Sequence, residues 1–197
     1  MKSEKLKRLA VSAIMVALAS VLSLIKVWQM PLGGSVTLLS MLPIVLVSVV
    51  YGVKQGLATS FVYAVIQLFF GITMDGLLGW GLTPIMLVGT IMLDYIIAFT
   101  VLGLAGFVAK KGYLGICLGT AFAICLRFVS HFISGVVIFR QLDQFELFGN
   151  LFENSPALYS AAYNGLFMLP ELVLTLAAVI ILFKLPQTKK LIEKYGA

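Results

Sequence analysis

The chain has 197 residues, of which 61% are hydrophobic and 11% are charged. A soluble domain carries about 25% charged residues, so this composition excludes a water-soluble globule. The net charge is +6, and most of the basic residues stand before the first apolar run, after the last one or between runs. Such flanking charges orient membrane helices, and they do not form the basic face of a nucleic-acid-binding protein.

The apolar runs predict an all-α membrane protein, because a helix that crosses a bilayer needs about 20 mostly apolar residues. We expect one integral membrane domain over residues 1–197. Its six transmembrane helices are predicted at about 8–27, 37–52, 56–72, 84–109, 113–139 and 158–184, with boundary errors of about two to four residues. The first run resembles a signal peptide but exceeds the usual core of about 7–15 residues and has no small-residue cleavage motif. We therefore expect it to remain as the first helix.

The loop charges predict the orientation, because cytoplasmic loops are rich in lysine and arginine. With the N-terminus inside, the cytoplasmic segments hold Lys2, Lys5, Lys7, Arg8, Lys54, Lys110, Lys111, Lys184, Lys189, Lys190 and Lys194. The outer segments hold only Lys26 and Arg140, together with the acids Asp75, Asp143, Glu146 and Glu153. We expect a multi-pass protein of the cell membrane with both termini in the cytoplasm.

The three outer loops, 28–36, 73–83 and 140–157, are longer than the inner turns, and the first two are rich in glycine. Pro31, Gly33 and Gly34 interrupt helix in the first of them, and glycine permits positive φ. Long outer loops above short inner turns indicate that the function faces outward.

Four ionisable residues fall within the predicted helices: Asp94, Arg127, His131 and Glu171. Each costs at least about 2.5–3.5 kcal/mol to insert, so each needs a partner or a use. At about 1.5 Å per residue they fall into two layers. The deeper layer holds Arg127 and Glu171, which we expect to form a structural pair. The outer layer holds Asp94, Tyr95, His131, Tyr159, Tyr163 and Asn164.

The outer layer predicts a pocket for a cationic, aromatic ligand, since a carboxylate and aromatic faces both attract a cation. Two structural alternatives stay open: Asp94 as a buried ion-pair partner of Arg127, and His131 as a hydrogen-bonded core residue. Ser134, His131 and Asp94 could form a hydrolytic set, but no nucleophile-elbow motif accompanies them. The sequence contains no GxxxxGKS or GxxxxGKT motif, no HExxH and only one histidine. We therefore expect no enzyme activity, no bound cofactor and no metal site.

Five stretches carry a resemblance to a known family: MPLGGSV at 30–36, YGVKQGL at 51–57, LDYIIAF at 93–99, RFVSHFISGVVIF at 127–139 and YSAAYNG at 159–165. In their order and spacing the chain resembles the thiamine-specific substrate-binding (S) components of energy-coupling factor (ECF) transporters. The resemblance implies a six-helix fold that captures thiamine from outside with high affinity. It also implies coupling to a separate transmembrane subunit and two ATPase subunits.

The same resemblance implies the substrate-binding residues Asp94, Tyr95, His131, Gly135, Phe139, Tyr159 and Asn164. Some family members have Glu in place of Asp94, Trp in place of Phe139, and a tryptophan near Gly34. Tyr63, Gln67 and Trp80 are expected to supply the missing contacts. In the first helix, Ala13 and Ala17 are small residues four apart, a spacing that lets helices approach closely in lipid. The resemblance implies that this face docks the transmembrane partner.

Two alternatives remain at this stage. The chain could be an S component for another vitamin or precursor, such as a hydroxymethylpyrimidine. It could also be a stand-alone proton-coupled carrier, with Asp94, Arg127, His131 and Glu171 as a proton relay. Transport that survives ATP depletion in a host without the partner subunits would favour the carrier.

Overall fold

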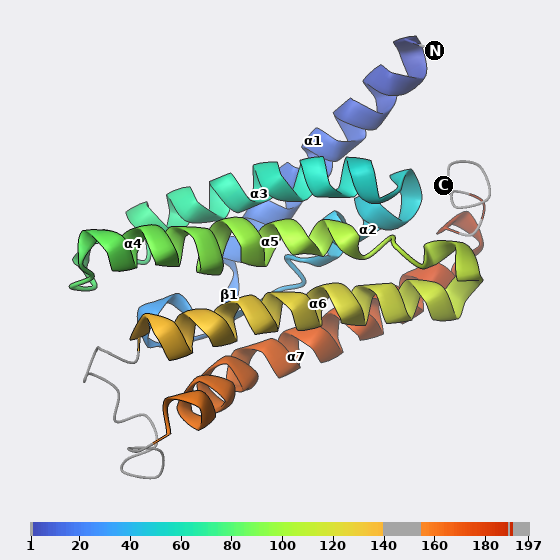
Figure 1. The fold of residues 1–197 in the computed structure, drawn as a ribbon. Helices are drawn as coiled ribbons and strands as arrows, with labels where there is room; N and C mark the ends of the chain where they lie inside the picture. The colour runs from blue at the N-terminus through green and yellow to red at the C-terminus, as the bar shows by residue number, and fades with distance from the viewer. Residues whose placement is uncertain (1, 140–154, 189, 191–197) are drawn as a thin grey trace.

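A computed structural model describes residues 2–139, 155–188 and 190 of the chain. Its long helices run side by side, and the start of α1 lies at the same end of the molecule as the end of α7 (Figure 1). The prediction of an all-helical membrane fold is confirmed. In chain order, the elements are α1 (Lys2–Leu24), β1 (Lys26–Gln29), η1 (Pro31–Gly33), β2 (Ser35–Thr37), α2 (Leu42–Tyr51), α3 (Val53–Thr73), η2 (Leu77–Gly79), α4 (Pro84–Thr90), η3 (Ile91–Ile97), α5 (Ala98–Thr100), η4 (Val101–Leu104), η5 (Ala109–Lys111), α6 (Gly112–Val137) and α7 (Pro156–Lys184).

Five helical segments of the described chain are long and apolar enough to cross a membrane: Ser3–Leu24, Val53–Thr73, Pro84–Leu104, Ala109–Val137 and Pro156–Lys184. The second predicted helix, at 37–52, differs, since α2 begins at Leu42 rather than near residue 37 and has 10 residues. At about 1.5 Å per residue it reaches only half of a hydrocarbon core about 30 Å thick. The hairpin before α2 must therefore complete this crossing.

The hairpin of β1 and β2 is a feature that the hydrophobic pattern did not predict. Its strands pair antiparallel, with Trp28 opposite Val36 and Gln29 opposite Ser35. The turn contains Leu32 at φ 54° and Gly33 at φ +88°, the left-handed region that glycine enters without cost. Non-helical backbone at membrane depth is tolerated where it is buried in protein or lines a cavity. The two strands bond their backbone groups to each other, and β2 is largely buried.

The fourth crossing is helical throughout but not regular. It passes from α4 into the π-helical turn η3, then through α5 into the 3₁₀ turn η4, whereas the pattern predicted one uninterrupted helix over 84–109. The hydroxyl of Ser48 on α2 binds the backbone near η4: it donates to Gly103 O and accepts from Gly106 N. π-helical turns occur frequently at functional sites, and this one contains Asp94 and Tyr95.

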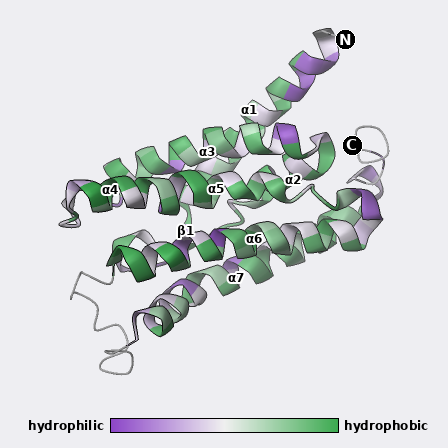
Figure 2. Cartoon of the chain, in the orientation of Figure 1, coloured by the Kyte–Doolittle hydropathy of each residue, from purple (hydrophilic) through white to green (hydrophobic). Residues whose placement is uncertain are grey.

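Strongly hydrophilic residues mark the end of the bundle that holds the start of α1 (Figure 2). Lys5, Lys7, Arg8, Lys54, Lys110, Lys111, Lys184 and Lys190 all belong to segments at this end. The positive-inside rule places it in the cytoplasm. Lys26 of β1 belongs to the opposite, outer half. Arg140, Asp143, Glu146, Glu153, Lys189 and Lys194, which also entered the prediction of orientation, lie outside the described residues.

The cytoplasmic half of the bundle is closed by a packed apolar cluster, which we call the inner cluster. α2, α6, α7 and the segment after η4 supply its members: Val45, Val49, Ala105, Ile116, Ala123, Val179 and Phe183. Each of these side chains is at most 3% exposed. These side chains close the space between α2, α6 and α7 on the cytoplasmic side.

We expect Gly103→Ala to lower the free energy of unfolding by about 1–3 kcal/mol, the usual cost of overpacking a closely packed position. A Cβ at Gly103 would lie 2.5 Å from the backbone nitrogen of Leu57 and 2.6 Å from the carbonyl carbon of Gly56. Denaturant or thermal unfolding in detergent measures the effect. Gly165→Ala is the matched control, because a Cβ there meets no atom within 4 Å. An equal loss of stability in both variants would contradict the close approach of these segments.

Candidate functional site

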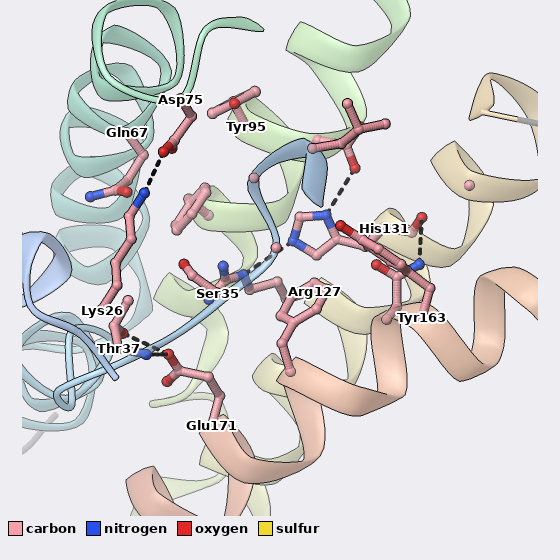
Figure 3. Close-up of a pocket in the computed structure, with 18 of the residues that line it drawn as sticks. Lys26, Ser35, Thr37, Gln67, Asp75, Tyr95, Arg127, His131, Tyr163 and Glu171 are labelled. Carbon is pink, nitrogen blue, oxygen red and sulfur yellow. Dashed lines mark hydrogen bonds and ion pairs between the residues drawn. The ribbon is translucent and has the colours of Figure 1, made fainter. Parts of the chain in front are cut away.

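A cavity of about 490 Å³ lies in the outer half of the molecule (Figure 3). Sites for small molecules have volumes of about 300–1,000 Å³. Helices α1, α3, α6 and α7, the hairpin and the π-helical turn η3 all contribute to its lining. All but one of the residues expected to bind substrate line it: Trp80, Asp94, Tyr95, His131, Gly135, Phe139, Tyr159 and Asn164.

Tyr63 is the exception. Its side chain is 0% exposed, and it is not part of the cavity lining. Its ring meets the edge of Phe99 at a centroid distance of 5.5 Å, and Phe99 does line the cavity. Tyr63 thus supports the wall from behind. Gln67, the other residue expected to add contacts, lines the cavity and donates to Ser23 Oγ at 2.8 Å.

Asp94 is held by two side chains of α6. His131 Nδ1 lies 2.8 Å from Asp94 Oδ1, and the Ser134 hydroxyl donates to Oδ2. Ser130, one turn earlier on α6, donates to the carbonyl of Leu93 at 2.5 Å. Three α6 side chains therefore fix the π-helical turn that carries the carboxylate. The structure has Asp94 paired with His131, and not directly with Arg127 as the structural alternative supposed.

Arg127 and Glu171, which were expected to pair, have separate partners. Glu171 Oε1 accepts from the backbone nitrogen and the hydroxyl of Thr37, both at 2.6 Å (Figure 3). Within the described part of the chain, no carboxylate oxygen lies within 4.0 Å of the Arg127 guanidinium. The hairpin accounts for the difference. It places Thr37 against α7, where Thr37 binds the carboxylate that the sequence analysis had paired with Arg127.

Aromatic rings form much of the remaining wall. Trp80 meets the edge of Phe139 at a centroid distance of 6.2 Å. On α7, Tyr159 stacks with Tyr163 at 6.4 Å, and Tyr163 meets Phe167 at 6.0 Å. The Tyr163 hydroxyl also donates to the carbonyl of Pro31, so it ties α7 to the hairpin.

Gly135 and Asn164 mark the closest approach of α6 and α7 beside the cavity. A Cβ at Gly135 would lie 2.2 Å from Ser160 Oγ, so only glycine fits there without a shift of its neighbour. Asn164 Nδ2 donates to Ser160 O at 2.9 Å and to His131 O at 3.4 Å. None of these bonds uses Oδ1 of Asn164, which leaves that oxygen for other partners.

An ion pair between Lys26 and Asp75 was missed by the sequence analysis, which treated both only as loop charges. Lys26 Nζ donates to Asp75 Oδ1, and Gln29 Nε2 lies 3.3 Å from the same oxygen (Figure 3). Trp80 Nε1 donates to the Asp75 carbonyl at 3.0 Å. The pair joins the hairpin to the segment after α3. Opposite charges in two glycine-rich outer loops were the available signal.

The charges of the cavity lining sum to a negative value. Among the described residues that line it, the cations are Lys26 and Arg127, and the carboxylates are Asp75, Asp94 and Glu171. Two positive and three negative formal charges leave −1. Such a cavity favours a ligand with one positive charge, because opposite charges compensate each other in a site of low dielectric constant.

The comparisons with known proteins identify the family of the chain. Residues 9–191 match the model of a protein family described as "Thiamine transporter protein". The thiamine transporter ThiT of Bacillus subtilis (strain 168) is 32% identical, over 92% of this chain and 93% of that protein. A solved structure of ThiT from Listeria monocytogenes has the same fold, with a TM-score of 0.68 at 19% identity over 95% of this chain and 98% of that one. Since the family model covers nearly the whole sequence, the chain belongs to the thiamine transporter protein family.

Proposed function

We propose that this chain is the substrate-binding component of an ATP-driven energy-coupling factor importer, which captures thiamine outside the cell with high affinity. In this proposal a separate transmembrane subunit and two ATPase subunits drive the release of thiamine into the cytoplasm. Membership of the family already makes the chain a multi-pass transport protein of the cell membrane and not an enzyme. The proposal adds the manner of capture and the partners.

The observation that carries the proposal is a carboxylate in an aromatic cavity. Asp94 lines the cavity together with Trp80, Phe139, Tyr159 and other rings. Thiamine has a thiazolium ring with a permanent positive charge and an aminopyrimidine ring. A cation over aromatic faces gains electrostatic energy from the ring quadrupoles, and more so where water is excluded. The formal charge of −1 in the lining is balanced by one such ligand.

The proposal of ATPase partners is consistent with the printed sequence. It has no phosphate-binding loop motif, and its described part consists mainly of membrane helices around one outward-facing cavity. A binding site of this kind captures ligand but supplies no free energy for uptake against a gradient. The energy would then come from subunits that bind ATP.

The proposed docking face for the transmembrane partner is on α1. Ala13 and Ala17 are both exposed, and residues four apart lie on one side of a helix. Small side chains there leave a shallow surface on which another helix can pack closely. Neither alanine lines the cavity, so docking and ligand binding would use different faces of α1.

The purified protein should bind thiamine in detergent without a partner and without ATP, because the cavity is already formed in the isolated chain. Isothermal titration calorimetry measures this directly. A titration with no heat from thiamine, but with heat from hydroxymethylpyrimidine or another vitamin, would overturn the choice of substrate and leave the fold untouched.

Asp94→Asn should weaken thiamine binding by about 100-fold or more, because a buried charge without its partner costs about 3–5 kcal/mol. Asp94→Glu keeps the charge and should bind more tightly than the asparagine variant. Asp75→Asn is a second control, since Asp75 is already neutralised by Lys26, and its effect should be smaller. Parental affinity in Asp94→Asn would show that Asp94 has a structural role only.

Ala13→Trp and Ala17→Trp should abolish thiamine uptake in cells that carry the ATPase module and leave binding by the purified protein unchanged. A bulky ring on α1 would hold the partner helix away from this face. Val173→Trp on α7 is the matched control, because Val173 is also exposed but lies on another helix. Loss of binding together with uptake would mean that this face packs inside the fold. Uptake by the parent after ATP depletion, in a host without partner subunits, would instead support the stand-alone carrier.

A further inference from the structure

Both ring nitrogens of His131 have a charged neighbour. Nδ1 lies 2.8 Å from Asp94 Oδ1 on the π-helical turn, and Nε2 lies 3.3 Å from Nε of Arg127, one turn back on α6. Figure 3 shows the contact with Arg127 at the side of the cavity. The imidazole thus stands between a cation and a carboxylate that do not touch each other.

The chemistry of the two neighbours determines where the proton of His131 lies. A guanidinium has only N–H donors and no acceptor, so Nε2 of His131 has to accept and carries no proton. In a neutral imidazole the other nitrogen carries the proton. Nδ1–H therefore donates to Asp94. Protonation of both nitrogens would place two donors, Nε2–H and the Arg127 N–H, against each other.

We propose that Arg127 is a positioning residue for ligand binding, which holds His131 as the neutral Nδ1–H tautomer and through it fixes the orientation and charge of Asp94. The importance of this for affinity rests on the proposed function, in which Asp94 compensates the thiazolium. His131 then contacts the ligand through its ring and not through a ring nitrogen, since both nitrogens are occupied within the protein. Asp94 keeps its full negative charge, because the group that binds it is neutral.

Arg127 is itself held rigidly enough for this role. Its guanidinium carbon lies 4.2 Å from the centroid of the Phe99 ring, and Nη1 donates to Met41 Sδ at 2.9 Å. Phe99 is supported in turn by Tyr63. Arg127 is 8% exposed, and among the described residues no carboxylate oxygen lies within 4.0 Å of its guanidinium. The direction of the Arg127 Nε donor is therefore fixed by packing.

The sequence offers a direct test, because it contains one histidine. Protein labelled with ¹⁵N-histidine and purified with a histidine-free affinity tag gives imidazole nitrogen signals from His131 alone. We expect a protonated Nδ1 and an unprotonated Nε2 in the parent without ligand. An Nε2–H tautomer or an imidazolium in this spectrum would overturn the inference, whatever the variants show.

Variants then link the tautomer to binding. Arg127→Met keeps an unbranched side chain but removes the donor to Nε2. Asp94 still accepts from Nδ1–H, so the expected change is at Nε2, which becomes free to take a proton and give an imidazolium. Thiamine affinity should fall by about ten- to a hundredfold, the range for losing a hydrogen bond to a charged group. Arg127→Lys keeps a donor toward Nε2 and should restore both the neutral imidazole and most of the affinity. An unchanged His131 spectrum in Arg127→Met would overturn the inference.

Ser134→Ala is the matched control. It removes the other hydrogen bond to Asp94 but leaves the contact between Arg127 and His131, so affinity should fall while the Nδ1–H tautomer persists. A change of tautomer in this variant would show that Arg127 does not set it. A parent with the expected tautomer that binds no thiamine would overturn the proposed substrate and leave the role of Arg127 toward Asp94 in place.

Discussion

The carboxylate of Asp94 is a negative charge placed within a hydrophobic slab, and hydrogen bonds from His131 and Ser134 hold it there before any ligand enters. Lipid offers no hydrogen-bond partners, so a polar cavity in a membrane protein has to satisfy its own groups. The rest of the outer half follows this requirement. The two strands of the hairpin bond to each other, and the Thr37 hydroxyl donates to Glu171. The Ser130 hydroxyl donates to the Leu93 carbonyl in the π-helical turn.

The hydrophobic runs and loop charges were sufficient to predict an all-helical membrane protein and its orientation. Depth along each predicted helix was sufficient to bring Asp94, His131 and Asn164 to one level, because helical rise is nearly constant. Depth does not specify which side chains meet across helices. Arg127 and Glu171 share a layer, yet Thr37 binds the glutamate. Thr37 belongs to a three-residue strand, which is too short to give a recognisable alternation.

The π-helical turn at Ile91–Ile97 was likewise not predictable from the apolar pattern. A π-helical turn changes the pairing of backbone groups but not the identity of the apolar residues. The apolar pattern of this segment is therefore the same as that of a regular α-helix. Its effect on the site is considerable, because it sets the direction in which Asp94 and Tyr95 project. Local backbone geometry, rather than residue type, decides this part of the cavity.

The inner cluster has a consequence for the membrane in which the protein resides. Val45, Val49, Ile116 and Phe183 fill the cytoplasmic half of the bundle with apolar side chains, and an ion that crossed it would lose its hydration without compensation. The cavity is thus closed on the cytoplasmic side by packed apolar side chains and is not part of a continuous pore. A cell can hold many copies of such a protein at its surface without electrical leak, and the proton-motive force stays available for other work.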